Sequence, residues 1–167
     1  MAIRTVRVDG DEILGKTCKE VKAMTPHLEQ LIDDMFETMY DQMGVGLAAP
    51  QVGVLRRIVV IDCSEDGSGA IVLINPRIVE REGEQTGYEG CLSIPGMRGI
   101  VTRPMRVVVE ALDEEMNPIR IEAEELLARA ICHECDHLDG ILYKELAQGP
   151  LEPVPQDEEE EEDGEEA

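Results

Sequence analysis

The chain has 167 residues and a net charge of −22, and it is 43% hydrophobic but only 2% aromatic. This length is enough for one domain with a core, which Leu, Ile, Val and Met must fill. No stretch is long and apolar enough to cross a bilayer, the first residues lack the apolar run of a signal peptide, and no basic cluster offers a footprint for nucleic acid. We therefore expect a cytoplasmic globular protein without direct nucleic-acid or membrane binding.

The first predicted element is a helix over residues 25–43, where apolar residues recur at helical spacing. Thr25 is a suitable N-cap, and Pro26 fits the first turn. Strand-like segments follow at residues 57–62, at residues 71–80 with an interruption at Pro76, and at residues 105–112 and 118–123, the last two forming a hairpin.

A second helix is predicted over residues 124–138, closed by Gly140. Scattered strands with two helices, and no regular βαβ alternation, predict an α+β fold. Residues 152–167 contain ten acids and no base, which is typical of a solvated segment, with attraction of a basic partner as the alternative. We place a folded domain at residues 1–149 and an acidic, disordered tail at residues 150–167.

The second helix carries the pattern H-E-x-x-H. His133 and His137 are four residues apart, so their imidazoles lie on one helix face and can share a metal ion. Glu134 lies beside that face, where it can take a proton from a metal-bound water. A chance arrangement of two histidines is the alternative.

Cysteines offer a rival site in the same helix. Five cysteines, an odd number without an export signal, favour buried thiols or metal ligands over disulfides. Cys132 and Cys135 form a C-x-x-C, but helix geometry points both away from the histidine pair. We expect them to be packing residues, with a redox or second metal site as the alternative.

A catalytic zinc-type site needs a third protein ligand. A downstream histidine of the protease pattern is missing, because Tyr143 stands in its place. Glu145 and Glu152 do not lie in a convincing helix, and His27 is expected at the surface. The better candidate is Cys91, in the stretch YEGCLSIPG.

Three motifs, GVGLAAPQVG (residues 44–53), EGCLSIP (residues 89–95) and HECDHLDG (residues 133–140), resemble the signature motifs of the peptide deformylases in order and spacing. The resemblance covers essentially residues 1–147. It implies removal of the formyl group from the initiator methionine of new polypeptides. It also implies an α+β fold with antiparallel strands packed around a central H-E-x-x-H helix.

The resemblance implies a role for each motif residue. A metal-bound hydroxide attacks the formyl carbon, with Glu134 as general base and then acid. The Gln51 amide and the Leu92 backbone N–H stabilise the oxyanion, although Gln51 alone would be interpreted as a turn-stabilising amide. The implied metal ligands are Cys91, His133 and His137, with water as the fourth.

Substrate contacts are also inferred from the family. The chain near Gly46 is expected to approach the substrate backbone, which binds like an added strand, and Gly90 is a further candidate contact; ordinary turn glycines, Gly44 included, are the alternative. Arg98 is expected to touch the peptide further out, with an exposed loop arginine as the alternative. The candidates for the methionine pocket, otherwise core residues, are Val45, Leu126 and Ala130.

One thiolate and two imidazoles suit Zn, Fe(II), Ni or Co. We expect Fe(II) in the cell, as in the family, with the others as substitutes. Glu89 and Asp136 flank the ligands, and we expect both to meet Arg103 and to orient the ligands; two surface acids are the alternative.

The chain departs from the family in two places. Cys132 stands where the family usually carries Gln, which affects fine tuning rather than a catalytic role. The acidic tail replaces the basic C-terminal helix by which some relatives dock on the ribosome, and ribosomal RNA would repel it. We therefore expect a monomer with at most transient ribosome proximity. The rival functions are an H-E-x-x-H endopeptidase and a non-catalytic domain stabilised by a metal.

Overall fold

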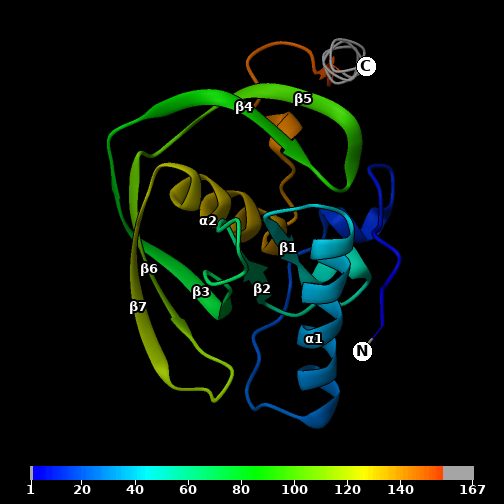
Figure 1. Ribbon diagram of the computed structural model, residues 1–167, viewed down its shortest axis with the longest axis vertical. Helices are drawn as coiled ribbons and strands as arrows, with labels where there is room; N and C mark the ends of the chain where they lie inside the picture. The colour runs from blue at the N-terminus through cyan, green and yellow to red at the C-terminus, as the bar shows by residue number, and fades with distance from the viewer. Residues whose placement is uncertain (1, 156–167) are drawn as a thin grey trace.

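Two antiparallel sheets and two α-helices make up residues 2–155, the part of the chain that the computed structural model describes (Figure 1). The five-stranded sheet has the order β1-β2-β3-β6-β7, and the three-stranded sheet has the order β4-β5-β8. The elements are η1 (Glu12–Gly15), α1 (Pro26–Asp41), β1 (Gly46–Ala48), η2 (Ala49–Val52), β2 (Ile58–Ile61), β3 (Ile71–Glu82), β4 (Gln85–Cys91), β5 (Ile94–Arg103), β6 (Arg106–Leu112), β7 (Pro118–Glu124), α2 (Glu125–Leu138), η3 (Tyr143–Glu145) and β8 (Glu152–Pro153), where η denotes a short 3₁₀ helix. The prediction of an α+β protein with antiparallel strands and few helices is confirmed.

Helix α1 begins where the sequence predicts. The Thr25 hydroxyl accepts a hydrogen bond from the Leu28 N–H at 3.2 Å, and Pro26 occupies the first turn. Its apolar face is buried against β1 and β2, so burial of this face holds the helix in place. The helix ends at Asp41, two residues earlier than predicted, because Met43 takes a positive φ of 57°.

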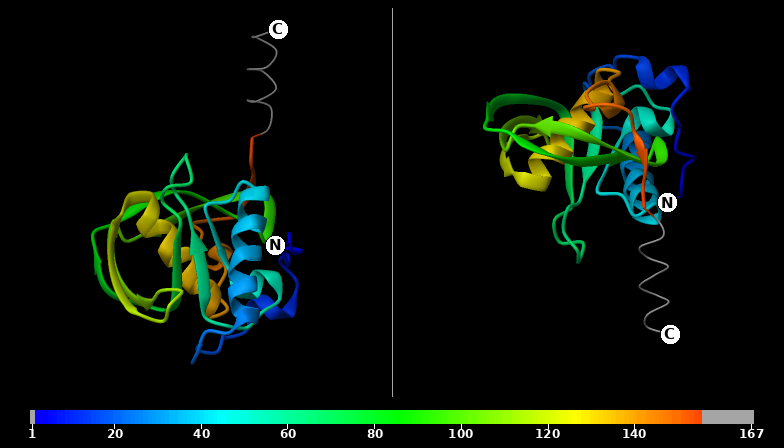
Figure 2. Two further views of the ribbon diagram at one scale, coloured as in Figure 1. Left: turned by 60° about the horizontal axis from the view of Figure 1, so that its bottom comes forward. Right: turned by 90° about the horizontal axis from the view of Figure 1, so that it is seen from above.

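Strand β2 separates the two helices. Its residues alternate between two apolar clusters, with Val59 and Ile61 facing the cluster of α2 and Ile58 and Val60 facing that of α1. Figure 2 shows the strand between the two helices. Burial on both faces explains why this segment is an unbroken apolar run.

The predicted interruption of the next segment is a bulge rather than a break. Strand β3 continues past Pro76, but its pairing with β6 shifts register between Ile74 and Arg77. Asn75 has a positive φ of 51° at this point, and proline cannot donate a ladder hydrogen bond. The β6–β7 hairpin is confirmed, with continuous pairing from Arg106–Glu124 to Leu112–Pro118.

Helix α2 also ends as predicted. Gly140 takes a φ of +77° and donates to the His137 carbonyl at 3.1 Å, while the Ile141 N–H donates to the Asp136 carbonyl at 2.9 Å. These two bonds form a Schellman cap. The helix lies between the β4–β5 hairpin and the curved β6–β7 hairpin (Figure 1). Its buried face carries Ala128, Ile131 and Leu138.

The end of the described chain pairs with the small sheet. Residues Glu152–Pro153 form β8 beside β5, three and four residues beyond the predicted end of the folded domain at residue 149. Residues 156–167, most of the predicted tail, lie outside the described part. None of the helices in residues 2–155 has both the length and the apolar character needed to span a membrane.

Candidate active site

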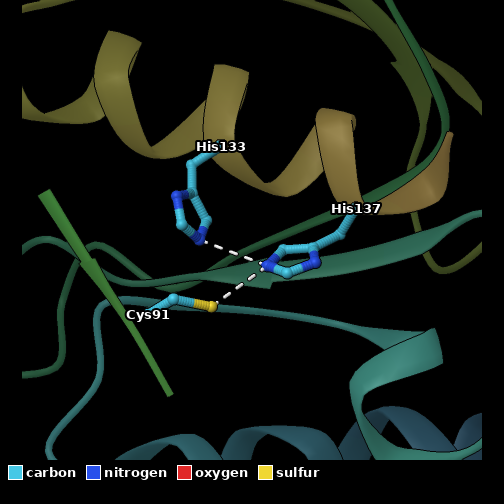
Figure 3. A group of neighbouring side chains, drawn as sticks. All are labelled: Cys91, His133 and His137. Carbon is cyan, nitrogen blue, oxygen red and sulfur yellow. Dashed lines mark hydrogen bonds between the residues drawn. The ribbon is translucent and has the colours of Figure 1, made fainter. Parts of the chain in front are cut away.

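Three side chains from two distant segments meet at the inner face of α2. His133 and His137 lie one helical turn apart, with 3.2 Å between their Nε2 atoms. Cys91, the last residue of β4, places its Sγ 3.3 Å from the His137 Nε2 (Figure 3). These three ligand atoms all lie within 4.8 Å of one another.

Local hydrogen bonds fix the cysteine loop. The β4–β5 pairing shifts register between Glu89 and Cys91, and such a bulge re-aims the strand end. The Ser93 N–H donates to the Cys91 sulfur at 3.4 Å, and the Gln51 amide approaches the same sulfur at 3.6 Å. The thiol is therefore held toward the histidines before any ion binds.

The donor set fits a transition-metal ion. One sulfur and two imidazole nitrogens suit Zn, Fe(II), Ni or Co. Glu89 accepts a hydrogen bond from the His133 Nδ1 at 2.6 Å, which leaves the Nε2 lone pair facing the other two ligands. Cys132 and Cys135 are buried in the apolar core and take no part in this cluster, as helix geometry predicted.

A buried charge network supports His133 from behind. Arg103 donates to both oxygens of Glu89, at 3.1 and 2.7 Å, and to Asp136 at 2.6 Å, which are the contacts expected from the sequence. Although burial alone would raise the pKa of Glu89, hydrogen bonds from His133 and Arg103 lower it to about 2.

The sequence interpretation missed Arg129, which joins the same network. Its guanidinium donates to Glu89 at 2.9 Å and to the Val101 carbonyl at 3.2 Å. An arginine four residues before His133 must lie on the histidine face of the helix. That spacing was the signal that could have revealed it.

Glu134 lies in the same buried region as the histidines. Burial raises its pKa to about 7, and its Oε1 atom has no hydrogen-bond partner among the described residues. A Cβ atom on Gly46 would lie only 2.5 Å from the Glu134 Oε2. The missing side chain at Gly46 therefore makes room for this carboxylate.

Gln51 and Leu92 approach the cluster from its other side. Gln51 is 1% exposed; its Oε1 accepts from the Ala48 N–H at 2.9 Å and its Nε2 donates to the Ser93 hydroxyl at 3.0 Å. The amide thus stabilises its own turn and also faces Cys91. Leu92 directly follows Cys91, and its side chain fills the space beside Gly44.

A cleft of about 500 Å³ opens onto these residues. His137, which is buried, and Arg98 are not among the residues that line it. Arg98 belongs to β5, where it stacks over the Tyr88 ring at 3.7 Å and pairs with Glu152 at 3.0 Å. The other residues predicted for the site all line the cleft: Val45, Gly46, Gln51, Gly90, Cys91, Leu92, Leu126, Ala130, His133 and Glu134.

Comparison with known proteins places this cleft in context. The sequence pattern of the family described as polypeptide deformylase matches residues 3–150. A peptide deformylase of Agathobacter rectalis is 62% identical over 154 residues, which cover 92% of this chain and 96% of that protein. One of Lachnoclostridium phytofermentans is 59% identical over 163 residues, which cover 98% of this chain and 100% of that protein.

Solved structures agree. The crystal structure of a peptide deformylase from Legionella pneumophila matches with a TM-score of 0.86 at 46% identity, covering 88% of this chain and 87% of that one. One from Synechococcus elongatus, in complex with actinonin, matches with a TM-score of 0.82 at 41% identity, covering 86% of this chain and 78% of that one. Likeness of sequence and of fold thus extends over nearly the whole described chain, and the protein belongs to the peptide deformylase family.

Proposed function

We propose that this chain removes the formyl group from the N-terminal formylmethionine of new polypeptides with Cys91, His133 and His137 as metal ligands and Glu134 as the proton carrier. The reaction is that of the family to which the chain belongs. One observation carries the assignment of residues: three ligand atoms within 4.8 Å of one another adjoin a buried carboxylate at an open cleft. Three protein ligands rather than four are typical of a catalytic metal site.

A bound ion would lower the pKa of a water molecule and polarise the formyl carbonyl. Glu134 is the proton acceptor in this proposal, because its Oε1 is free of hydrogen bonds among the described residues and lies at the cleft. The carboxylate takes a proton from the attacking water and passes it to the nitrogen of the leaving amine. Formate and a free N-terminal methionine are the products.

Negative charge develops on the formyl oxygen during the attack. The Gln51 amide, held by Ala48 and Ser93, is a preorganised donor for that oxygen, and the Leu92 N–H is the second. Losing one such donor costs about 3 kcal/mol of transition-state stabilisation. In this proposal α2 is the central element of the fold, since it carries both histidines and Glu134.

Two edge strands flank the cleft and suit an extended peptide. Strand β1 ends the large sheet and β4 ends the small one, and Gly46 and Gly90 lie on these edges. A peptide between them can form main-chain hydrogen bonds as an added strand. Its methionine side chain would enter the pocket between Val45, Leu126 and Ala130.

We further propose Fe(II) as the metal in the cell, with Zn, Ni or Co as substitutes that the same donors accept. A monomer acting in the cytoplasm on new polypeptides completes the proposal. The endopeptidase alternative lacks support, because Tyr143 supplies no metal-binding nitrogen and packs with its ring 6.0 Å from that of His133.

Formate release from formyl-Met-Ala-Ser by Ni-loaded protein tests the assignment. We expect Glu134→Gln to keep its metal content and to lose about 10³-fold in kcat/KM, within the range for a general base. Cys91→Ala should instead lose the metal. Formate release that persists in Glu134→Gln, or cleavage of internal peptide bonds, would contradict the proposal.

A further inference from the structure

Residues 151–154, here called the strap, run beside β5 of the small sheet and reach the cleft at Val154. Strand β8 pairs antiparallel with β5, Pro153 opposite Met97 and Glu152 opposite Arg98. The Val154 N–H extends this pairing by donating to the Gly96 carbonyl at 2.9 Å. Val154 is also one of the residues that line the cleft.

The strap is anchored by packing. Leu151 belongs to the apolar cluster of Ile94, Val101 and Tyr143. A Cβ atom on Gly99 would lie 2.6 Å from the Leu151 side chain, so the leucine occupies the space that this glycine leaves. The chain is thus fixed to β5 before it reaches the cleft, and Val154 is held as part of its wall.

The strap also changes the charge at the cleft mouth. The Arg98 guanidinium donates to the Glu152 carboxylate at 3.0 Å and lies over the Tyr88 ring at 3.7 Å. The one arginine or lysine in the cleft lining, Arg129, is committed to Glu89. Among the described residues, the cleft therefore offers an incoming carboxylate no uncompensated arginine or lysine.

Nine further acids and no base follow in the sequence between Pro155 and the end of the chain. Charges of one sign at a cleft repel like-charged ligands and attract opposite ones, most strongly at low ionic strength.

We propose that β8 is a specificity element: it walls the peptide groove with Val154 and, by neutralising Arg98, leaves the negative net charge of the chain unopposed at the cleft mouth, so that substrates with acidic residues after the formylmethionine are disfavoured. This inference rests on the proposed function, because it takes the cleft as the peptide site. It concerns the choice among formylated peptides and leaves the hydrolysis itself to the residues described above.

The test compares three amidated peptides, formyl-Met-Ala-Lys, formyl-Met-Ala-Glu and the neutral formyl-Met-Ala-Gln, with Ni-loaded full-length protein. We expect kcat/KM to be about tenfold higher for the Lys peptide than for the Glu peptide at about 10 mM salt, where the Debye length is about 30 Å. In about 1 M salt the ratio should approach one.

Two variants locate the effect. Glu152→Gln leaves Arg98 uncompensated and should lower the Lys-to-Glu ratio of kcat/KM about threefold at low salt, which is the size of a surface charge effect. In high salt the ratio should stay as in the wild type. Truncation after Pro155, which removes nine acids, should lower the Lys-to-Glu ratio by more than Glu152→Gln does. Glu110→Gln, which removes the same charge at an exposed pair with Arg77 outside the cleft lining, should match the wild type.

A ratio near one for the wild type at low salt, or a ratio that both variants leave unchanged, would overturn the inference. Those results are distinct from a failure of the proposed function, in which none of the three peptides would release formate. A drop in kcat/KM for all three peptides alike in Glu152→Gln would show a structural role only and would also reject selection by charge.

Discussion

Two buried regions of this molecule are built on opposite principles. Behind α1 lies a cluster of apolar side chains in which Met35 and Met39 are fully buried. Behind His133 lies a cluster of charges in which Arg103 is only 5% exposed and Glu89 only 6%. Both regions are closed to water, but only the first gains free energy simply by being closed.

The difference separates what holds the fold from what prepares the site. Removing an apolar side chain from water is favourable by about 25 cal/mol per Å². Burying Glu89 and Arg103 costs desolvation energy, which their short hydrogen bonds only offset. The stability of helix α2 alone therefore does not account for this network. Its product is an imidazole fixed in one tautomer and one orientation at the metal cluster.

The largest effect is expected from Arg103→Ala. Asp136 would lose its arginine partner and Glu89 would keep only Arg129 and His133, so the free energy of unfolding should fall by about 3–5 kcal/mol. Metal affinity should fall about 10–100-fold, because Glu89, which orients His133, would lose part of its own support. Urea denaturation and competition with a chelator measure the two effects.

Arg77→Ala is the matched control for that change, since Arg77 pairs with Glu110 and its own side chain is 77% exposed. Its effect on stability should stay below about 1 kcal/mol. If Arg103→Ala behaved like this control, the distinction between the buried charge network and ordinary surface pairs would be lost.

The second largest effect is expected at acid pH, where the charged region loses stability through protonation of Glu89. The pKa of Glu89 is lowered from 4.5 to about 2, so the stability it contributes is fully present above pH 4.5 and is lost as the pH falls from there through about 2. The loss amounts to about 3 kcal/mol at 1.36 kcal/mol per unit of pKa. Denaturation of the metal-free protein across this range measures it.

Glu89→Gln should flatten the same pH dependence, because the titrating carboxyl is gone. A slope between pH 4.5 and 2 that the variant fully retained would show that other carboxyls carry the acid sensitivity.

Met35→Ala tests the apolar region. We expect a loss of about 2–3 kcal/mol, at the low end for such truncations because the flexible Met39 can relax into the space. The loss should be independent of pH, and kcat/KM of the folded variant should be unchanged. Met35→Leu, which nearly conserves volume, should recover most of the stability. A changed metal affinity in Met35→Ala would show that the two regions are coupled.

The elements held by apolar packing were also the more predictable from sequence. Helix α1, strand β2 and the β6–β7 hairpin follow from local periodicity and caps such as Thr25. Strands β4 and β5 were not predicted, because glycines such as Gly87 and Gly99 break their apolar pattern and only contacts distant in sequence cover them. The two residues of β8 look like a tail in composition, and their pairing depends entirely on β5.

The site divides in the same way. His133, Glu134 and His137 could be read from one helix, since their relation is set by 3.6 residues per turn. Cys91 was identified only by elimination and by family resemblance, because nothing local connects it to the helix. The role of Arg129 on α2 could not be predicted in this way, since its partner Glu89 lies on strand β4, forty residues away in sequence. What sequence reasoning missed was pairing between elements.

The smallest expected effect is at the start of α1. Thr25→Ala removes the hydroxyl that accepts the Leu28 N–H, and loss of such a cap costs about 1 kcal/mol. The penalty should be smaller than that of Met35→Ala, because packing of the apolar face rather than the cap holds the helix. Thr25→Ser should keep the cap and the stability. Thermal unfolding compares the three proteins, and hydrogen exchange should show faster exchange only in the first turn. If Thr25→Ala were as unstable as Met35→Ala, α1 would depend on its N-cap rather than on its buried face. The apolar region would then not be stabilised mainly by burial, and its contrast with the charged region would fail.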